Sequence, residues 1–268
     1  MRPIWSGVLA FGLVTIPVKL FSATEISNEV QFHLLDKNTL TPIKEVRVNP
    51  ETGKAVAWEH IVHGVEYARG KYVALTNEEL KALPLPTAST VDISGFVSAE
   101  LIDPLFFDRA YFLGPDTGGA KAYELLRGVL QEERKAALGK VTIRTREHPV
   151  AVRSEGRALI MQTLHYPDEV RKTSDIPDLP RKVTLQAHEV KMAKQLVASM
   201  SVTFEPDEFH SDYKKALQKL VKAKLAGKGL TVQKPAFAKV IDLQQALQAS
   251  LKQAQGGARR GHWKRVAS

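Results

Sequence analysis

Basic side chains recur through residues 140–157 in a pattern that suits binding to phosphate. Three share one parity of an expected strand, and two flank the next turn: Lys140, Arg144 and Arg146, then Arg153 and Arg157. Residues of one parity leave the same face of a strand, so we expect these side chains to form one surface. Lysine and arginine bind phosphate oxygens, and no aromatic residue interleaves them for base stacking. The segment predicts a surface that follows a duplex backbone, with a solvated strand face held by salt bridges as an equal alternative.

The C-terminal end carries a second basic cluster, and this one includes an aromatic residue. Its cations are Arg259, Arg260, Lys264 and Arg265, placed around Trp263 in a Gly- and Arg-rich segment. Such a segment is expected to be disordered when free and to gain stability by lying along phosphates. Lysines also recur between residues 214 and 228, where a solvated helix face is the commoner explanation.

The positive charge of the chain is concentrated at its C-terminal end. The net formal charge of the 268 residues is +9, which indicates a polyanionic partner. Residues 1–204 hold 25 Lys+Arg against 24 Asp+Glu, whereas residues 205–268 hold 13 against 5. If the nearly neutral body also binds DNA, its cations must therefore gather on one surface.

Composition excludes several classes of site. The chain has no cysteine, so disulfides, thiolate zinc sites and cysteine nucleophiles are excluded. No stretch reaches the roughly 18 uninterrupted apolar residues of a membrane helix. These observations predict a cytoplasmic protein with no membrane contact.

Patterns typical of enzymes are weak. Asp116-Thr117-Gly118 matches the aspartic-protease triplet, but Gly114-Pro115 separates it from the preceding strand and a helix is expected to follow. His188-Glu189 lacks the second histidine of a zinc protease, because Met192 stands there. The sequence predicts a protein without catalytic residues, metal or cofactor, and a hydrolase using Asp116 is the alternative.

The N-terminal stretch, residues 1–24, allows two interpretations. Its apolar run follows Arg2, as in a secretory signal peptide, but Ser6, Gly7 and Gly12 interrupt it and Pro17 falls where cleavage would occur. Apolar residues on both parities instead predict one or two strands, broken near Gly12 and buried on both faces.

Periodicity predicts strands in the first part of the chain and helices after it. The expected strands are residues 1–21, 30–35, 43–48, 71–75, 90–97, 110–113, 140–146, 150–153 and 158–164. A first helix is expected to begin at a Thr76 capping box and to end before Pro84. A second is expected to follow the 114–119 loop and to run for about twenty residues, and three more are expected over 187–200, 212–225 and 241–254. Residues 167–182 predict an irregular arm. The order indicates a mainly β body with helical extensions.

Collinear segments along about 225 residues resemble the bacterial Ku proteins. They begin with Arg2-x-Ile4-Trp5-x-Gly7 and Phe11-Gly12-Leu13-Val14. They continue with Gly70-Lys71-Tyr72-Val73, Ile102-Asp103-Pro104, Tyr111-Phe112-Leu113, Pro167-Asp168-Glu169-Val170-Arg171, Glu189-Val190-Lys191-Met192-Ala193 and Phe204-Glu205-Pro206-Asp207. Each segment is weak alone, and their common order makes the resemblance specific.

The resemblance implies a mainly β Ku-type barrel with a long bridge, in which two copies form a ring that duplex DNA threads. It implies binding to DNA ends without sequence specificity in non-homologous end joining, and recruitment of the dedicated ATP-dependent DNA ligase. A Cys-x-x-Cys pair of some members is replaced by Asn49 and Thr52, which excludes a zinc site there.

The same resemblance suggests three regions and a partner surface. The expected regions are a core over residues 1–185, a helical arm for dimer or ligase contact over 186–228, and a flexible basic tail over 229–268. The residues expected to contact a partner are Phe204, Pro206, Tyr213, Leu217 and Leu220. The alternative from another class is the hydrolase using Asp116, and a second alternative is a nucleoid-type protein that coats DNA internally without forming a ring.

Overall fold

The computed structural model describes residues 1–25, 32–83, 87, 89–144, 146–180, 182–227 and 243–255. The chain divides into two compact units, Met1–Asp175 and Ile176–Ser268. The first unit holds every named strand, and the second holds three α-helices. Among the residues described, no helix is long and apolar enough to cross a bilayer.

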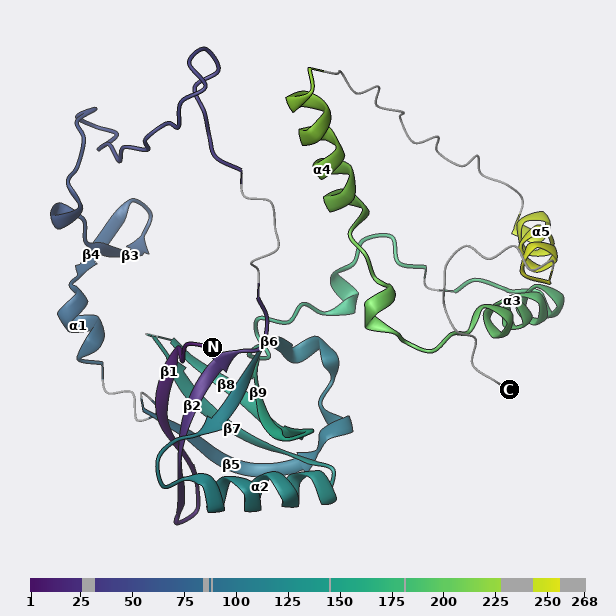
Figure 1. The fold of residues 1–268 in the computed structure, drawn as a ribbon, viewed down its shortest axis with the longest axis horizontal. Helices are drawn as coiled ribbons and strands as arrows, with labels where there is room; N and C mark the ends of the chain where they lie inside the picture. The colour runs from purple at the N-terminus through teal and green to yellow at the C-terminus, as the bar shows by residue number, and fades with distance from the viewer. Residues whose placement is uncertain are drawn as a thin grey trace. The chain divides into compact units, whose positions relative to one another are not determined.

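Seven strands of the first unit close into a barrel (Figure 1). They are β1 (Trp5–Phe11), β2 (Val14–Ser22), β5 (Thr90–Ser98), β6 (Phe107–Pro115), β7 (Lys135–Ile143), β8 (Arg146–Glu155) and β9 (Ala158–Leu164). Around the barrel the order is β1-β2-β6-β9-β8-β7-β5. Neighbouring strands are antiparallel except β1 and β5, whose parallel pairing closes the sheet. The β-barrel expected from the sequence is confirmed.

The interior of the barrel is apolar because alternate residues of its strands point inward. On β2 the side chains of Ile16, Val18 and Leu20 are completely buried, and each contributes about 1.5–3 kcal/mol relative to an exposed position. Gly12 has a φ of 58° between β1 and β2, a left-handed conformation that glycine adopts at no steric cost. The expected break between two N-terminal strands is confirmed.

Helix α2 (Ala120–Glu132) crosses one open end of the barrel, since it contacts β2, β7 and β8. Its buried residues are Tyr123, Leu126 and Leu130. The Tyr123 hydroxyl donates to the Leu113 carbonyl at 2.6 Å and accepts from the Leu159 backbone N–H at 2.7 Å. It therefore ties the helix to β6 and β9. The helix is shorter than the twenty residues expected, because the chain turns at Arg134 (φ 51°) to enter β7.

Residues 32–83 form an extended arm with little core of its own. Its two strands, β3 (His63–Ala68) and β4 (Lys71–Leu75), pair with each other in a separate sheet. Helix α1 (Asn77–Lys81) begins at the Thr76 capping box expected from the sequence. The strands expected over 30–35 and 43–48 are wrong where the structure describes them, since only isolated bridges form, Leu35 with Pro42 and Val48 with Ala55. Apolar residues were present there, but no neighbouring strand supplies a ladder of backbone partners.

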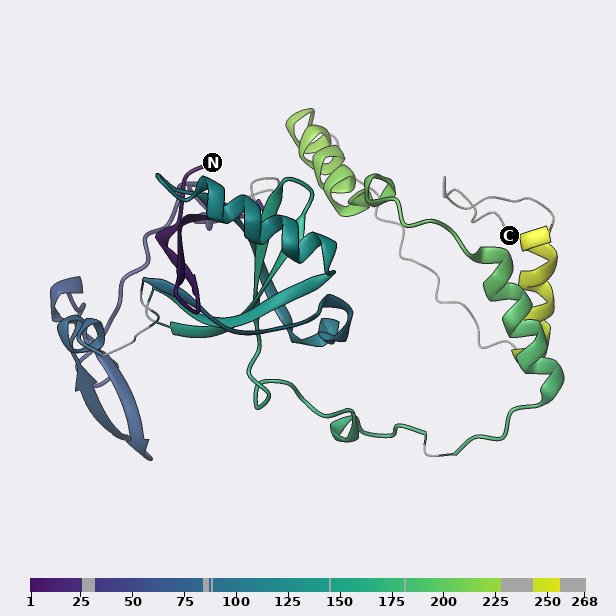
Figure 2. The same ribbon diagram turned by 90° about the horizontal axis from the view of Figure 1, so that it is seen from below.

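The second unit contains α3 (Ala187–Met200), α4 (Asp212–Leu225) and α5 (Leu243–Gln255). Figure 2 shows α3 and α5 side by side, and contacts between these helices agree with that view. The expected bounds of α3 and α4 are confirmed. Residues 176–186, which include the last part of the expected irregular arm, form no regular element where they are described.

Gly139→Ala is expected to destabilise the barrel by about 2 kcal/mol or more, because overpacking a tight interior forces the backbone to move. A Cβ at this position on β7 would lie 2.1 Å from the Asp92 carbonyl oxygen on β5. The control is Gly128→Ala on α2, where a Cβ meets no atom within 4 Å and alanine favours the helix by about 0.5–1 kcal/mol. Urea unfolding measures both, and equal stability of Gly139→Ala and the unmodified chain would contradict the expectation.

Candidate nucleic-acid interface

The basic segment forms a hairpin, and this changes where its cations point. β7 ends at Ile143, which pairs with Arg146 at the start of β8. Arg144 lies in the turn with a φ of 62°, and residue 145 lies outside the described residues. The expected continuous strand over 140–146 is therefore wrong. Thr142 is only 2% exposed, and its hydroxyl lies 2.7 Å from that of Thr87.

Lys140 remains exposed on β7 and is held by an acidic neighbour. Its Nζ lies 3.1 Å from Glu147 Oε2 across the hairpin. Glu147 also accepts hydrogen bonds from the hydroxyls of Thr87 at 3.0 Å and Tyr166 at 3.4 Å. The hydrogen bond from Lys140 is the main cause that lowers the pKa of Glu147, and the same bond raises the pKa of Lys140. Both groups are therefore charged at neutral pH and largely balance each other.

Arg146 is paired in the same way. Its guanidinium donates to Glu169, which lies in the segment after β9. Glu169 also accepts from the Tyr166 backbone N–H at 3.0 Å, and this bond is the main cause that lowers the pKa of Glu169. Arg146 therefore fastens the segment after β9 to the hairpin. The alternative of a strand face held by salt bridges describes Lys140 and Arg146 well.

Arg153 and Arg157 lie at the other end of β8. Arg153 pairs with Glu155 and donates to Gln162 Oε1 at 3.2 Å. Arg157 stands in the β8–β9 turn, and its charge helps to lower the pKa of Glu124 after the larger effect of the Arg127 hydrogen bond. The length of β8 separates them from the β7–β8 turn, roughly 30 Å for a strand of this length. The single cationic face expected from parity is therefore wrong, although the role of each residue in DNA binding stays a prediction.

Arg144 differs from the other cations of this region. It is exposed at the tip of the β7–β8 hairpin and forms no salt bridge with any residue that the structure describes. A positive φ disfavours side chains with a Cβ, and glycine or asparagine adopts it more readily. Arg134 has a similar φ of 51°, so what marks Arg144 among the cations of the hairpin is that it has no salt bridge to the described residues.

Asp116 does not resemble the catalytic carboxylate of a protease. Its Oδ1 lies 2.7 Å from Lys19 Nζ and accepts from the Thr117 backbone N–H at 2.7 Å. The hydrogen bond from Lys19 is the main cause that lowers its pKa. Sequence spacing missed this pair because Lys19 and Asp116 lie on β2 and just after β6, which are neighbours only in the barrel. Across the described ranges, no group of three acidic or histidine side chains could hold a metal ion.

The residues expected to contact a partner lie in the segment between α3 and α4 and on α4 itself. Phe204 is 71% exposed and Tyr213 69% exposed, whereas Leu217 is buried and Leu220 is half-buried. Pro206 opens a short 3-10 turn, Pro206–Glu208. The sequence analysis missed Phe209, whose ring centroid lies 5.6 Å from that of Phe204. The signal in the sequence was that Phe204 and Phe209 stand on either side of Pro206. Arg259, Arg260, Lys264 and Arg265 lie outside the described residues.

Comparison with known proteins identifies the family. Residues 10–192 match the family model "Ku: Ku70/Ku80 beta-barrel domain", which covers more than half of the chain. The chain belongs to the Ku family. It is 42% identical over 255 residues to the non-homologous end joining protein Ku of Heliobacterium modesticaldum, covering 94% of this chain and 92% of the relative. The protein of the same name from Opitutus terrae is 41% identical, with 97% and 95% covered, and that of Bacillus subtilis is 38% identical, with 94% and 82% covered.

The matched region contains the barrel except for the first residues of β1, together with the arm over residues 32–83. It also contains the β7–β8 hairpin and the beginning of α3, and it ends before the aromatic residues around the proline turn. The resemblance found from collinear sequence segments is confirmed.

Glu147→Gln is expected to destabilise the protein at neutral pH and to have no effect in acid. The folded pKa of Glu147 is depressed, so the carboxylate stabilises the fold above its unfolded pKa of about 4.3. This stabilisation is lost as the pH falls through the lower folded pKa, where both proteins become equally stable. Thermal unfolding from pH 3 to pH 8 measures the difference. The control, Glu155→Gln, removes a more exposed pair with Arg153, and a pH-independent loss in Glu147→Gln would contradict the assignment.

Proposed function

We propose that two copies of this chain form a ring that binds the ends of double-stranded DNA without sequence specificity and acts in non-homologous end joining. The protein needs no cofactor and has no catalytic chemistry of its own, and it recruits the ATP-dependent DNA ligase that seals the break. Membership of the Ku family, with relatives named for this pathway at 42% and 41% identity, carries the proposal. Action on the chromosome places the protein in the cytoplasm, associated with the nucleoid.

The exposed arm supports the homodimer. Trp58 is 68% exposed, and the Arg47 guanidinium lies 4.5 Å from its ring centroid. Tyr67 and Tyr72 on the two-stranded sheet are exposed to a similar degree. An isolated hairpin of this kind is marginally stable in water and needs further apolar contact. A second copy of the chain supplies such contact, and the two arms together then enclose the DNA.

Enclosure explains how a nearly neutral body can hold a polyanion. The cations Lys140, Arg146 and Arg153 are each paired with a carboxylate, which limits their free charge. A closed ring prevents sideways dissociation, so a small number of phosphate contacts is sufficient. Contact with the backbone rather than with base edges also suits a protein that must accept any broken end.

The exposed aromatic segment supports contact with the ligase. Phe204, Phe209 and Tyr213 present apolar surface beside Glu205, Asp207 and Glu208, and aromatic residues dominate the energy of many interfaces. We assign ligase recruitment to residues 186–228, and retention of DNA to the basic tail over 229–268. The hydrolase alternative is not supported, because the Asp116 carboxylate forms a salt bridge with Lys19.

Arg144→Asn is expected to weaken binding to duplex ends and to reduce its salt dependence. Loss of one phosphate contact lowers the slope of log affinity against log salt by about 0.9. Asparagine tolerates the positive φ of this position. The matched control is Arg134→Asn, because Arg134 is exposed at the other end of β7 with a φ of 51°. Fluorescence anisotropy with a 30-base-pair duplex measures both, and an equal change in the two variants would remove Arg144 from the interface.

Linear DNA is expected to compete for the protein far better than covalently closed circular DNA of the same length and sequence. A closed ring can load only where the duplex has a terminus, whereas a protein that coats DNA internally binds both forms. The measurement is competition against a labelled short duplex. Equal competition by the two forms would reject end binding in favour of the nucleoid-protein alternative.

A further inference from the structure

Helix α5 covers part of the apolar face of α3. The apolar residues of α3 recur with helical spacing at Val190, Ala193, Leu196 and Val197, yet no residue of α3 is fully buried. α5 packs along this helix and brings Leu247 and Leu251 half-buried to the contact. Val197, at the far end of the face, is left 68% exposed. α3 is thus a helix whose apolar face is covered in part by a segment of its own chain.

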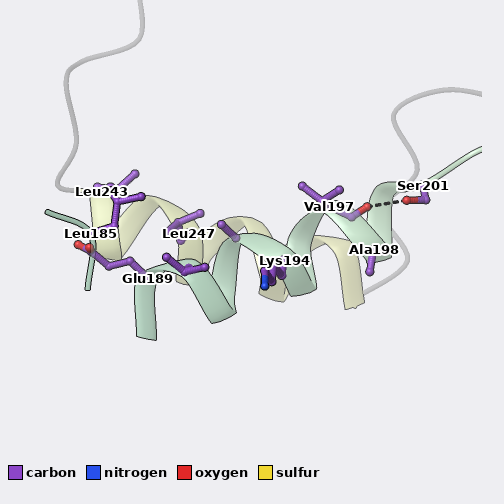
Figure 3. Close-up of a pocket in the computed structure, with 10 residues that line it drawn as sticks. Leu185, Glu189, Lys194, Val197, Ala198, Ser201, Leu243 and Leu247 are labelled. Carbon is purple, nitrogen blue, oxygen red and sulfur yellow. Dashed lines mark hydrogen bonds between the residues drawn. The ribbon is translucent and has the colours of Figure 1, made fainter. Parts of the chain in front are cut away.

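A hollow of about 630 Å³ remains between the two helices. Figure 3 shows Leu185, Leu243 and Leu247 toward one end and Val197, Ala198 and Ser201 at the other. Most of the lining is aliphatic. A volume of this size accepts several apolar side chains of a helix laid along the groove.

Three of the residues that line the hollow are polar, Glu189, Lys194 and Ser201. Glu189 Oε2 accepts from the Gln186 backbone N–H at 3.0 Å as part of the capping box of α3. The Ser201 hydroxyl donates to the Val197 carbonyl at 2.9 Å. With two of the three engaged within the chain and most of the lining aliphatic, the hollow favours apolar side chains over a polar small molecule.

The contact between α3 and α5 is suited to exchange. None of the side chains that the structure describes in either helix is fully buried, and Leu243 at the start of α5 is 57% exposed. α5 buries only one seam on α3 and leaves Val197 at the far end of the face uncovered. A partner helix that covers more of this face can therefore begin in the hollow and replace α5.

We propose that α5 is a cover for the ligase-recruiting surface: it occupies the apolar face of α3 in the free protein, and an amphipathic helix of the ligase displaces it. This inference rests on the proposed recruitment of the ligase by residues 186–228. The covered fraction sets the apparent affinity, so a cover that is in place about nine-tenths of the time weakens ligase binding about tenfold.

Leu247→Asp in the full-length chain tests the cover. An aspartate in the apolar contact is expected to release α5 and to strengthen binding of the end-joining ligase from the same organism about tenfold, measured by isothermal titration. Leu251→Asp is a second variant with the same expected result. Gln248→Asp is the matched control, because it adds the same charge at an exposed position of α5 and is expected to leave ligase affinity unchanged.

A measurement without ligase tests whether α5 covers α3, independently of whether this unit recruits the ligase. The chain contains no cysteine, so Ala193→Cys introduces a single thiol on the covered face, and its reaction with a bulky maleimide is expected to be about tenfold faster when Leu247→Asp is also present. An unchanged rate would reject the cover itself. A faster rate with unchanged ligase affinity would reject the regulation and leave recruitment intact. Absence of ligase binding in every variant would reject the proposed recruitment and with it the regulation.

Discussion

The parallel pairing of β1 with β5 is the constraint on which the rest of the structure depends. The other pairs of the barrel are antiparallel, and without this one the sheet would have two open edges, which invite pairing with other chains. Closure requires β5 and β7 to approach closely, and Gly139 beside the Asp92 carbonyl permits that distance. Once closed, the barrel buries apolar residues of its first strands and of its last strands in one interior. Closure also fixes the position of each hairpin turn at the ends of the barrel.

Pairing of opposite charges shapes the surface of the barrel. Lys19, Lys140, Arg146 and Arg153 each contact a carboxylate, in agreement with the near balance of charge over residues 1–204. Such partly exposed pairs add little stability individually. Their consequence is electrostatic, because they neutralise these four cations, whereas Arg144 at a hairpin tip forms no salt bridge with the residues that the structure describes. A body whose charge is so nearly balanced gains from enclosing a duplex.

The arm and the C-terminal helices share a property that the barrel lacks. Both expose large apolar side chains, such as Trp58 on the arm and Val197 on α3, and neither builds a core of its own comparable to that of the barrel. Segments of this kind gain stability when their apolar side chains are covered, as α5 covers part of α3. Under the proposed function a second copy covers the arm and a ligase helix replaces α5, while the barrel is the stable base.

The sequence by itself determined most of the elements and the family. Local signals were sufficient for α3, α4, the Thr76 capping box and the strands around Gly12, because periodicity and caps act within a few residues. Collinear motifs were sufficient for the Ku resemblance. Strand parity failed at residues 144–146, because the chain reverses between Ile143 and Arg146, which pair with each other, and parity carries no information across the reversal. Apolar alternation also failed over 43–48, since a strand exists only where another strand supplies its hydrogen bonds.

Only the tertiary structure decided which charges are free. The pairs of Lys19 with Asp116 and of Arg146 with Glu169 join residues 97 and 23 positions apart, and no spacing in the sequence indicates them. The same is true of the contact between α3 and α5, whose partners are separated by more than forty positions. The physical reason is that a salt bridge or a helix contact depends on distance in space, which barrel closure and helix packing set after the local elements have formed.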